Sequence, residues 1–177
     1  MSTNEVGGIR LPDYEVCELS LNPRVEPHDV SRQALAGEAL KVIQMEGPVH
    51  TTEIARRIAN GHGKTKVGAR ILSAVKSALL LLQHQEDLIE DEGFWLAEKH
   101  VDNPPTRARA NASGLLQKAE LISPIELRAI GELVIQEYGP LEPDAMAREI
   151  TRAMGFKQAG TALKNAINAA LNPGETS

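Results

Sequence analysis

An internal repeat constrains this chain more than any other feature of its sequence. When the sequence is shifted by about 92 residues against itself, helix breakers and apolar positions coincide without a gap. The coinciding pairs include Val42-Ile43-Gln44 with Val134-Ile135-Gln136, Gly47-Pro48 with Gly139-Pro140, Ala55-Arg56 with Ala147-Arg148, and Ala78-Leu79 with Ala170-Leu171. The repeat therefore predicts two copies of one folding unit.

The first copy has the pattern of a helix-turn-helix. A helix is expected over 31–46, capped by Ser31 and stopped by Gly47-Pro48, because proline cannot continue a helical ladder. A second helix opens at Thr51-Thr52, whose hydroxyls can accept bonds from free N–H groups. After a glycine-broken turn, apolar residues at helical spacing predict a third helix from Val67 to Gln85.

A hairpin is expected directly after these helices. Leu88-Ile89-Glu90 and Phe94-Trp95-Leu96 read as two short strands around a turn at Asp91-Glu92-Gly93. Three helices followed by a hairpin form a winged helix. Alternation places Trp95 on the opposite face from Phe94, so we expect one of these aromatic rings to be half exposed, with a core position favoured over a base-stacking one.

The second copy starts at Ser123-Pro124-Ile125-Glu126, which combines a serine cap, a proline at the first helical position and a glutamate three residues after the serine. Its helices are expected over 124–138, 143–154 and 158–171, without a wing. The predicted fold class is thus mainly α, with tandem helix-turn-helix units. The expected division is an extended segment over 1–30, a winged helix-turn-helix over 31–98, a linker over 99–122, and a second three-helix unit over 123–173.

Composition excludes several functional classes. The net charge of -5 argues against a protein that coats nucleic acid along its whole surface. The single cysteine, Cys17, cannot form an intramolecular disulfide, which fits a reducing cytoplasm. No apolar run is long enough to cross a bilayer, and the N-terminus lacks a signal-peptide pattern. We therefore expect a cytoplasmic protein with no membrane partner.

No motif in the chain indicates catalysis, a cofactor or a metal site. Gly61-His62-Gly63-Lys64-Thr65 resembles the end of a phosphate-binding loop, but Ile58 stands where that loop needs glycine, and a helix rather than a strand precedes it. The histidines are scattered without ligand spacing, and no serine, cysteine or lysine has a nucleophile context. The sequence favours a non-enzymatic protein without cofactors.

The positive indication is the distribution of charge. No acid occurs between Ile54 and Gln85, although the chain as a whole is anionic. The third helix of a helix-turn-helix enters the major groove, where cations neutralise phosphates and arginine can read guanine. At helical spacing, Lys66, Arg70, Ser73 and Ser77 share one flank. The predicted DNA-binding residues are Arg56, Arg57, Lys64, Lys66, Arg70, Ser73, Lys76 and Ser77.

Two features favour the alternative that these cations only solvate an exposed helix. The expected wing tip, Glu90-Asp91-Glu92, would repel a phosphate backbone. The equivalent flank of the second copy, Gln158, Ala162, Asn165 and Ala169, is far poorer in charge, although Lys157 and Lys164 lie nearby. The alternative function is a protein-interaction or dimerisation module with no direct DNA contact.

Several strings also suggest a family. The strings Glu46-Gly47-Pro48-Val49-His50, Glu53-Ile54-Ala55-Arg56-Arg57-Ile58, Gly68-Ala69-Arg70-Ile71, Gly93-Phe94-Trp95 and Gly155-Phe156-Lys157 resemble an uncharacterised domain at the C-terminal end of large bacterial helicase-like, nuclease-associated proteins. The resemblance spans roughly residues 30–172. It implies a place in a DNA-processing system but no assigned activity for this part. Together with the charge distribution, it leads us to expect a non-enzymatic accessory module that binds duplex DNA at low affinity, with parent helicase or nuclease domains, or a homodimer, as further partners.

Overall fold

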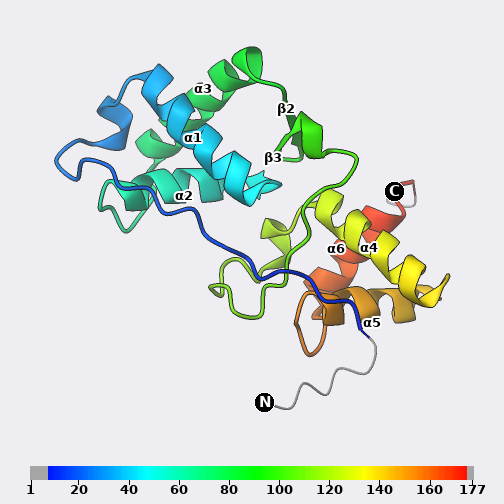
Figure 1. The fold of residues 1–177 in the computed structure, drawn as a ribbon. Coiled ribbons are helices and arrows are strands. Elements are labelled where there is room, and N and C mark those ends of the chain that lie inside the picture. Colours follow the sequence, from blue (N-terminus) through cyan, green and yellow to red (C-terminus); the bar gives the residue numbers. More distant parts are fainter. Residues whose placement is uncertain (1–7, 175–177) are drawn as a thin grey trace. The chain divides into compact units, whose positions relative to one another are not determined.

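The structure, a computed structural model, describes residues 8–174 (Figure 1). The chain forms two compact units: unit 1 comprises Met1–Tyr14 and Pro104–Ser177, and unit 2 comprises Glu15–Asn103. The described part is mainly helical with one small three-stranded antiparallel sheet. Residues 1–7 of the expected extended segment lie outside the described residues.

Three helices form the body of unit 2: α1 (Arg32–Glu46), α2 (Thr51–Gly61) and α3 (Ala69–Gln85). The serine cap predicted for α1 is confirmed, because the Ser31 hydroxyl accepts the Ala34 N–H at 3.2 Å. Helix α3 begins two residues later than predicted. Gly68 is extended at its N-cap, with φ -82° and ψ 172°, so Lys66 and Val67 precede the helix.

The cap of α2 differs from the prediction. His50 takes that role, and its ring Nδ1 accepts the Thr52 N–H at 3.2 Å. The Thr51 hydroxyl instead donates to the Gly93 carbonyl at 3.1 Å and accepts from the Trp95 indole N–H at 2.9 Å. The threonine that sequence reasoning assigned to the helix start therefore ties α2 to the hairpin.

The sheet has one strand more than predicted. Strands β1 (Val49–His50), β2 (Leu88–Asp91) and β3 (Phe94–Ala97) lie in the order β1-β3-β2, with Val49 opposite Trp95. Because Asp91 pairs with Phe94, Glu92-Gly93 form a two-residue turn. Both have positive φ, 53° and 87°, as a type I′ hairpin turn requires, and glycine adopts such φ values without strain.

Both hairpin aromatic residues are buried, so the predicted half-exposed ring is wrong. Phe94 is 5% exposed and Trp95 6%, while Leu96 is fully buried. β3 is the central strand, and the Thr51 hydroxyl satisfies the indole N–H. The prediction that these aromatic residues lie in the core rather than form a platform for base stacking is confirmed. The described part also contains short 3-10 helices: η1 (Pro27–Asp29), η2 (Glu98–His100) and η3 (Ala119–Leu121).

Unit 1 repeats the three-helix pattern with α4 (Pro124–Tyr138), α5 (Pro143–Ala153) and α6 (Thr161–Leu171). The starts of α4, α5 and α6 lie 92 positions after those of α1, α2 and α3. Gly63 and Gly155, which follow α2 and α5, both have positive φ, 77° and 88°. The sequence repeat is therefore also a repeat of helix starts and of one turn conformation.

Part of the expected linker belongs to the interior of unit 1. Arg109 is fully buried and Leu116 is 2% exposed. Ala108 bonds in both directions to the segment near the N-terminus, donating to the Pro12 carbonyl at 2.8 Å and accepting from the Tyr14 N–H at 2.9 Å. The sequence of this stretch shows only turn-forming residues. The stretch is held in unit 1 by contacts with residues about a hundred positions earlier, which local sequence does not reveal.

Candidate nucleic-acid interface

Three of the eight predicted DNA-binding residues are held by carboxylates. Arg57 is 5% exposed, and its Nε and Nη2 donate to the two oxygens of Glu46 at 2.8 and 2.7 Å. Its Nη1 donates to Glu53 Oε2 at 3.1 Å. Glu46 also accepts the backbone N–H of Cys17 at 2.9 Å. Arg57 thus joins α1, α2 and the preceding extended segment inside unit 2.

Arg56 lies beside this network. Its guanidinium pairs with the other oxygen of Glu53, and about a third of its side chain, 32%, is exposed. Burial lowers the pKa of Arg56 below its ordinary value, and the neighbouring charge of Arg57 lowers it further. Two carboxylates, Glu46 and Glu53, thus balance the two arginines, so the pair presents little free positive charge to an anionic ligand.

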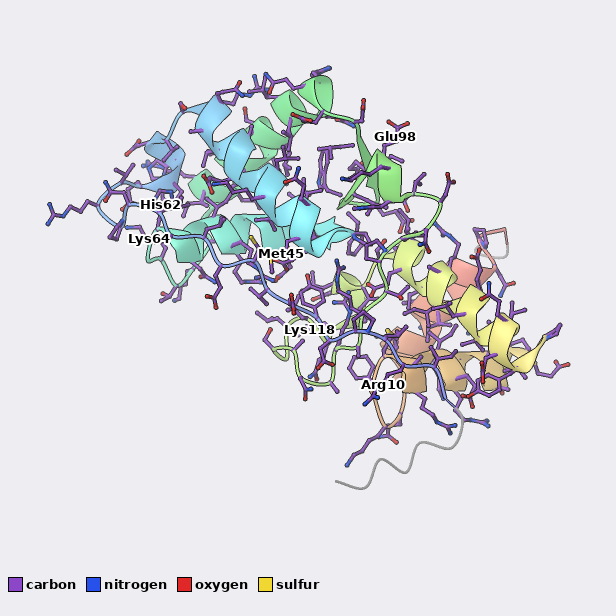
Figure 2. The ribbon with its side chains drawn as sticks, in the orientation of Figure 1. Arg10, Met45, His62, Lys64, Glu98 and Lys118 are labelled. Atoms are coloured by element: carbon purple, nitrogen blue, oxygen red, sulfur yellow. The ribbon has the colours of Figure 1, made fainter. Side chains whose placement is uncertain are left out.

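Lys64 is held by the segment before α1. Its Nζ donates to Glu26 Oε1 at 2.6 Å, and this hydrogen bond lowers the pKa of Glu26. In the same place His62 Nδ1 lies 2.8 Å from the Asn22 carbonyl, and the Leu21 N–H donates to the Gly61 carbonyl at 3.0 Å. Figure 2 shows His62 and Lys64 where this segment passes the end of α2. The start of the turn between α2 and α3 is therefore packed against this segment, whereas Gly63, Thr65 and Lys66 are exposed.

The remaining predicted residues lie at the start and along the outer side of α3. Lys66, Arg70, Ser73 and Lys76 are exposed, and Ser77 is half-buried. On a helix of about 100° per residue, Arg70, Ser73 and Ser77 fall within roughly 60°, and Lys76 lies about 60° beyond Ser73. Because Lys66 precedes the helix, it does not belong to that flank. We name Lys66, Arg70, Ser73 and Lys76 the α3 basic surface.

Arg32 adds a cation that sequence reasoning missed. It is exposed on the first turn of α1, and its Nε donates to the Ser77 carbonyl at 2.8 Å. The hydrogen bond therefore holds the Arg32 guanidinium against α3. The sequence carries no indication of this, because the two residues lie 45 positions apart and meet only through helix packing. Leu80, 55% exposed on α3, was also not singled out.

The acidic hairpin tip is anchored at the start of α2. The Gly93 carbonyl accepts the Thr51 N–H at 2.9 Å, and Glu90 Oε1 accepts the Gly93 N–H at 2.6 Å. Arg70, in contrast, lies in the first turn of α3, which follows the end of α2. The acidic hairpin tip is therefore bonded to the start of α2, whereas the α3 basic surface follows the end of α2 in the chain.

Unit 1 contains a second buried ion pair. Arg109 Nη2 donates to Glu126 Oε2 at 2.6 Å, Arg109 Nη1 donates to the Leu116 carbonyl at 3.0 Å, and the guanidinium lies 4.8 Å from the centroid of the Tyr14 ring. Glu126 Oε1 also accepts the Arg107 N–H at 2.9 Å. Each unit thus has a buried glutamate that pairs with an arginine and binds the backbone of an extended segment.

Two general observations complete the site. Within residues 8–174, no three His, Cys, Asp or Glu side chains are grouped as a metal ion would require. No helix in that range has both the length and the apolar character needed to span a bilayer.

Comparison with known proteins gives one match. Residues 25–73 match the model of a family described as a protein of unknown function (DUF3320). The match covers less than a third of the chain and includes η1, α1, α2 and the start of α3, with part of the α3 basic surface. No curated protein and no solved structure matches the chain. The matched stretch therefore marks an uncharacterised domain within unit 2.

Proposed function

We propose that the chain is a non-enzymatic DNA-binding module that contacts duplex DNA through α3 of unit 2. The observation that carries this proposal is the exposure of Lys66, Arg70 and Lys76 on a stretch without acids. Arg32, held against Ser77, extends the positive surface. We further propose that the element order α1-β1-α2-α3-β2-β3 is that of a winged helix-turn-helix, with α3 in the major groove.

The expected affinity is low. Three or four phosphate contacts give a slope of log Kobs against log salt of about -3, at roughly 0.9 per contact. Affinity would then fall by about fiftyfold between 50 and 200 mM salt. Arg56, Arg57 and Lys64 form ion pairs with carboxylates inside the protein, so they add little to this salt slope. The family resemblance supports a place in a larger helicase-like, DNA-processing system, which would raise the effective concentration of DNA at α3.

Fluorescence anisotropy with a labelled duplex, at low and moderate salt, tests the proposal. The double substitution Lys66→Glu with Arg70→Glu should weaken binding by more than tenfold and reduce the salt slope by about two. Lys118→Glu changes an exposed cation of unit 1 (Figure 2) and should have a much smaller effect. If the double variant binds as tightly as the wild type, α3 is not the contact.

A second candidate is dimerisation through the same helix, and Leu80 favours it. Leu80 is 55% exposed on α3, and its side chain would gain free energy by burial against a second copy but not against a phosphate backbone. Light scattering separates the two functions. A dimer that Leu80→Ser dissociates, together with no DNA binding at low salt, would replace the first candidate by the second.

A further inference from the structure

The two units differ at one pair of equivalent surfaces. In unit 2, Ile43 near the end of α1 is 1% exposed and packs in the same cluster as Trp95 of β3. Its equivalent in unit 1, Ile135, is 45% exposed, and Tyr138 at the end of α4 is 41% exposed. The hairpin of unit 2 thus covers an apolar surface for which the described part of unit 1 has no covering strand.

A groove lies at this uncovered surface. Its volume is about 270 Å³, and it lies between the end of α4, the start of α5 and the end of α6. Ile135, Leu141, Pro143, Met146 and Leu171 supply most of its apolar lining. This volume suits one or two large apolar side chains and is below the usual range for a small-molecule site, about 300–1,000 Å³. The groove therefore fits side-chain anchors of another polypeptide.

The charges around the groove define the partner's chemistry. Between Arg128 and Arg148 the chain has four acids, Glu132, Glu137, Glu142 and Asp144, and no Lys or Arg. All four are exposed. Helices α4 and α6 also end here, at Tyr138 and Leu171, and helix C-termini favour cations. The complementary ligand carries apolar anchors flanked by Lys or Arg.

A proline decides between a strand and a helix as the occupant. In unit 2 the covering hairpin is fixed by backbone bonds, among them Thr51 N–H to the Gly93 carbonyl at 2.9 Å. The equivalent of Thr51 in unit 1 is Pro143. Pro143 has no N–H to donate, which disfavours strand addition. A helix satisfies its own backbone bonds and needs only side-chain contacts.

We propose that this groove is the docking site of an amphipathic helix of a partner protein, with apolar residues at i, i+3 and i+4 inside the groove and basic residues at its flanks. This site is separate from the α3 basic surface of unit 2. It gives the chain a protein contact in one unit beside the proposed DNA contact in the other.

A labelled model helix tests the proposal with the full chain. The probe is an amphipathic leucine–lysine peptide of about four helical turns, and the control peptide has glutamate at every lysine. We expect micromolar binding of the lysine peptide in an anisotropy titration, and none of the glutamate peptide. Ile135→Asn should weaken binding by about tenfold, because the half-exposed side chain loses the apolar area it would bury. Val101→Asn, at an exposed apolar residue of unit 2, is the matched control and should leave the affinity unchanged.

A charge reversal provides the second variant. Glu137→Lys with Glu142→Lys lies on exposed positions and changes the net charge of the four acids from -4 to 0, so it should abolish the preference for the lysine peptide. Circular dichroism checks that both variants remain folded. Absence of binding by the lysine peptide, or an equal loss with Val101→Asn and Ile135→Asn, would overturn the proposal. So would a double Glu→Lys variant that prefers the lysine peptide as strongly as the wild type does.

Discussion

Arg57 provides the sharpest test of the structure, because sequence reasoning and structure give it different roles. As a DNA contact it could be replaced without loss of stability. In the structure its guanidinium bonds to Glu46 and Glu53, whose side chains are 0% and 3% exposed. Arg57→Ala would leave one buried carboxylate, Glu46, without its ionic partner and Glu53 with only Arg56. We expect unit 2 to be strongly destabilised.

The size of the effect follows from burial. Removing one partner of a buried ion pair costs about 3–5 kcal/mol. A domain of this size shifts its melting temperature by about 4–8 °C per kcal/mol, so the expected fall exceeds about 12 °C. This cost is a large fraction of the roughly 5–15 kcal/mol that stabilises a small domain.

The chain offers its own probe and control. Trp95 is the single tryptophan, is 6% exposed and lies in unit 2, so its fluorescence during urea unfolding reports on that unit. Arg56→Ala is the matched control on the adjacent residue. It removes a partly exposed guanidinium and leaves Glu53 with Arg57, so the expected loss is at most about 1 kcal/mol. Equal losses for the two variants, or a folded Arg57→Ala chain that lacks only DNA binding, would refute the buried network.

Three further predictions concern the other unit and two titrating groups. Arg109→Ala should reduce the helical circular dichroism of unit 1, because the substitution leaves Glu126 buried without its ionic partner. The midpoint of the Trp95 fluorescence transition, which reports on unit 2, should stay unchanged; a parallel shift of that midpoint would mean that the units unfold together. The hydrogen bond from Lys64 lowers the pKa of Glu26, so the stabilisation by this pair is present above the usual glutamate pKa and is lost as pH falls through the lowered value. A carboxyl NMR titration should show the pKa of Glu26 rising in Lys64→Met, and an unchanged pKa would contradict the pairing. Burial, and next the charge of Glu46, raise the pKa of the Cys17 thiol, so labelling by a disulfide reagent at neutral pH should be slow in the folded chain and rapid in concentrated urea; equal rates would contradict its burial.

Helix positions could be predicted from the sequence because they depend on local chemistry. Ser31 and Ser123 cap helices as expected, accepting the N–H groups of Ala34 and Ile125. The positions of the hairpin strands were also correct. The short strand β1 was missed, because two residues carry no periodicity of their own and pair only once β3 is in place.

The partners of the charged residues were less predictable. Glu53 lies three and four positions before Arg56 and Arg57, a helical spacing that indicates ion pairs. The acid-free stretch begins at Ile54, one residue after Glu53, so the composition of that stretch alone does not show this local pairing. Glu46, in contrast, lies on another helix and meets Arg57 only through tertiary packing. The exposure of Arg70 and Lys76 followed from the apolar face of α3 alone.

Unit 2 is an insertion within unit 1. The segment that ends at Tyr14 contacts residues near Ala108 and Arg109, with Leu11 in the same core, and the intervening residues 15–103 form a body of their own. During synthesis the inserted body has all its residues available first, whereas the enclosing body must wait for its last helix. A fragment that starts at residue 104 would consequently lack one wall of its interior, and residues 8–14 reach their native neighbours only after residues 15–103 have been synthesised.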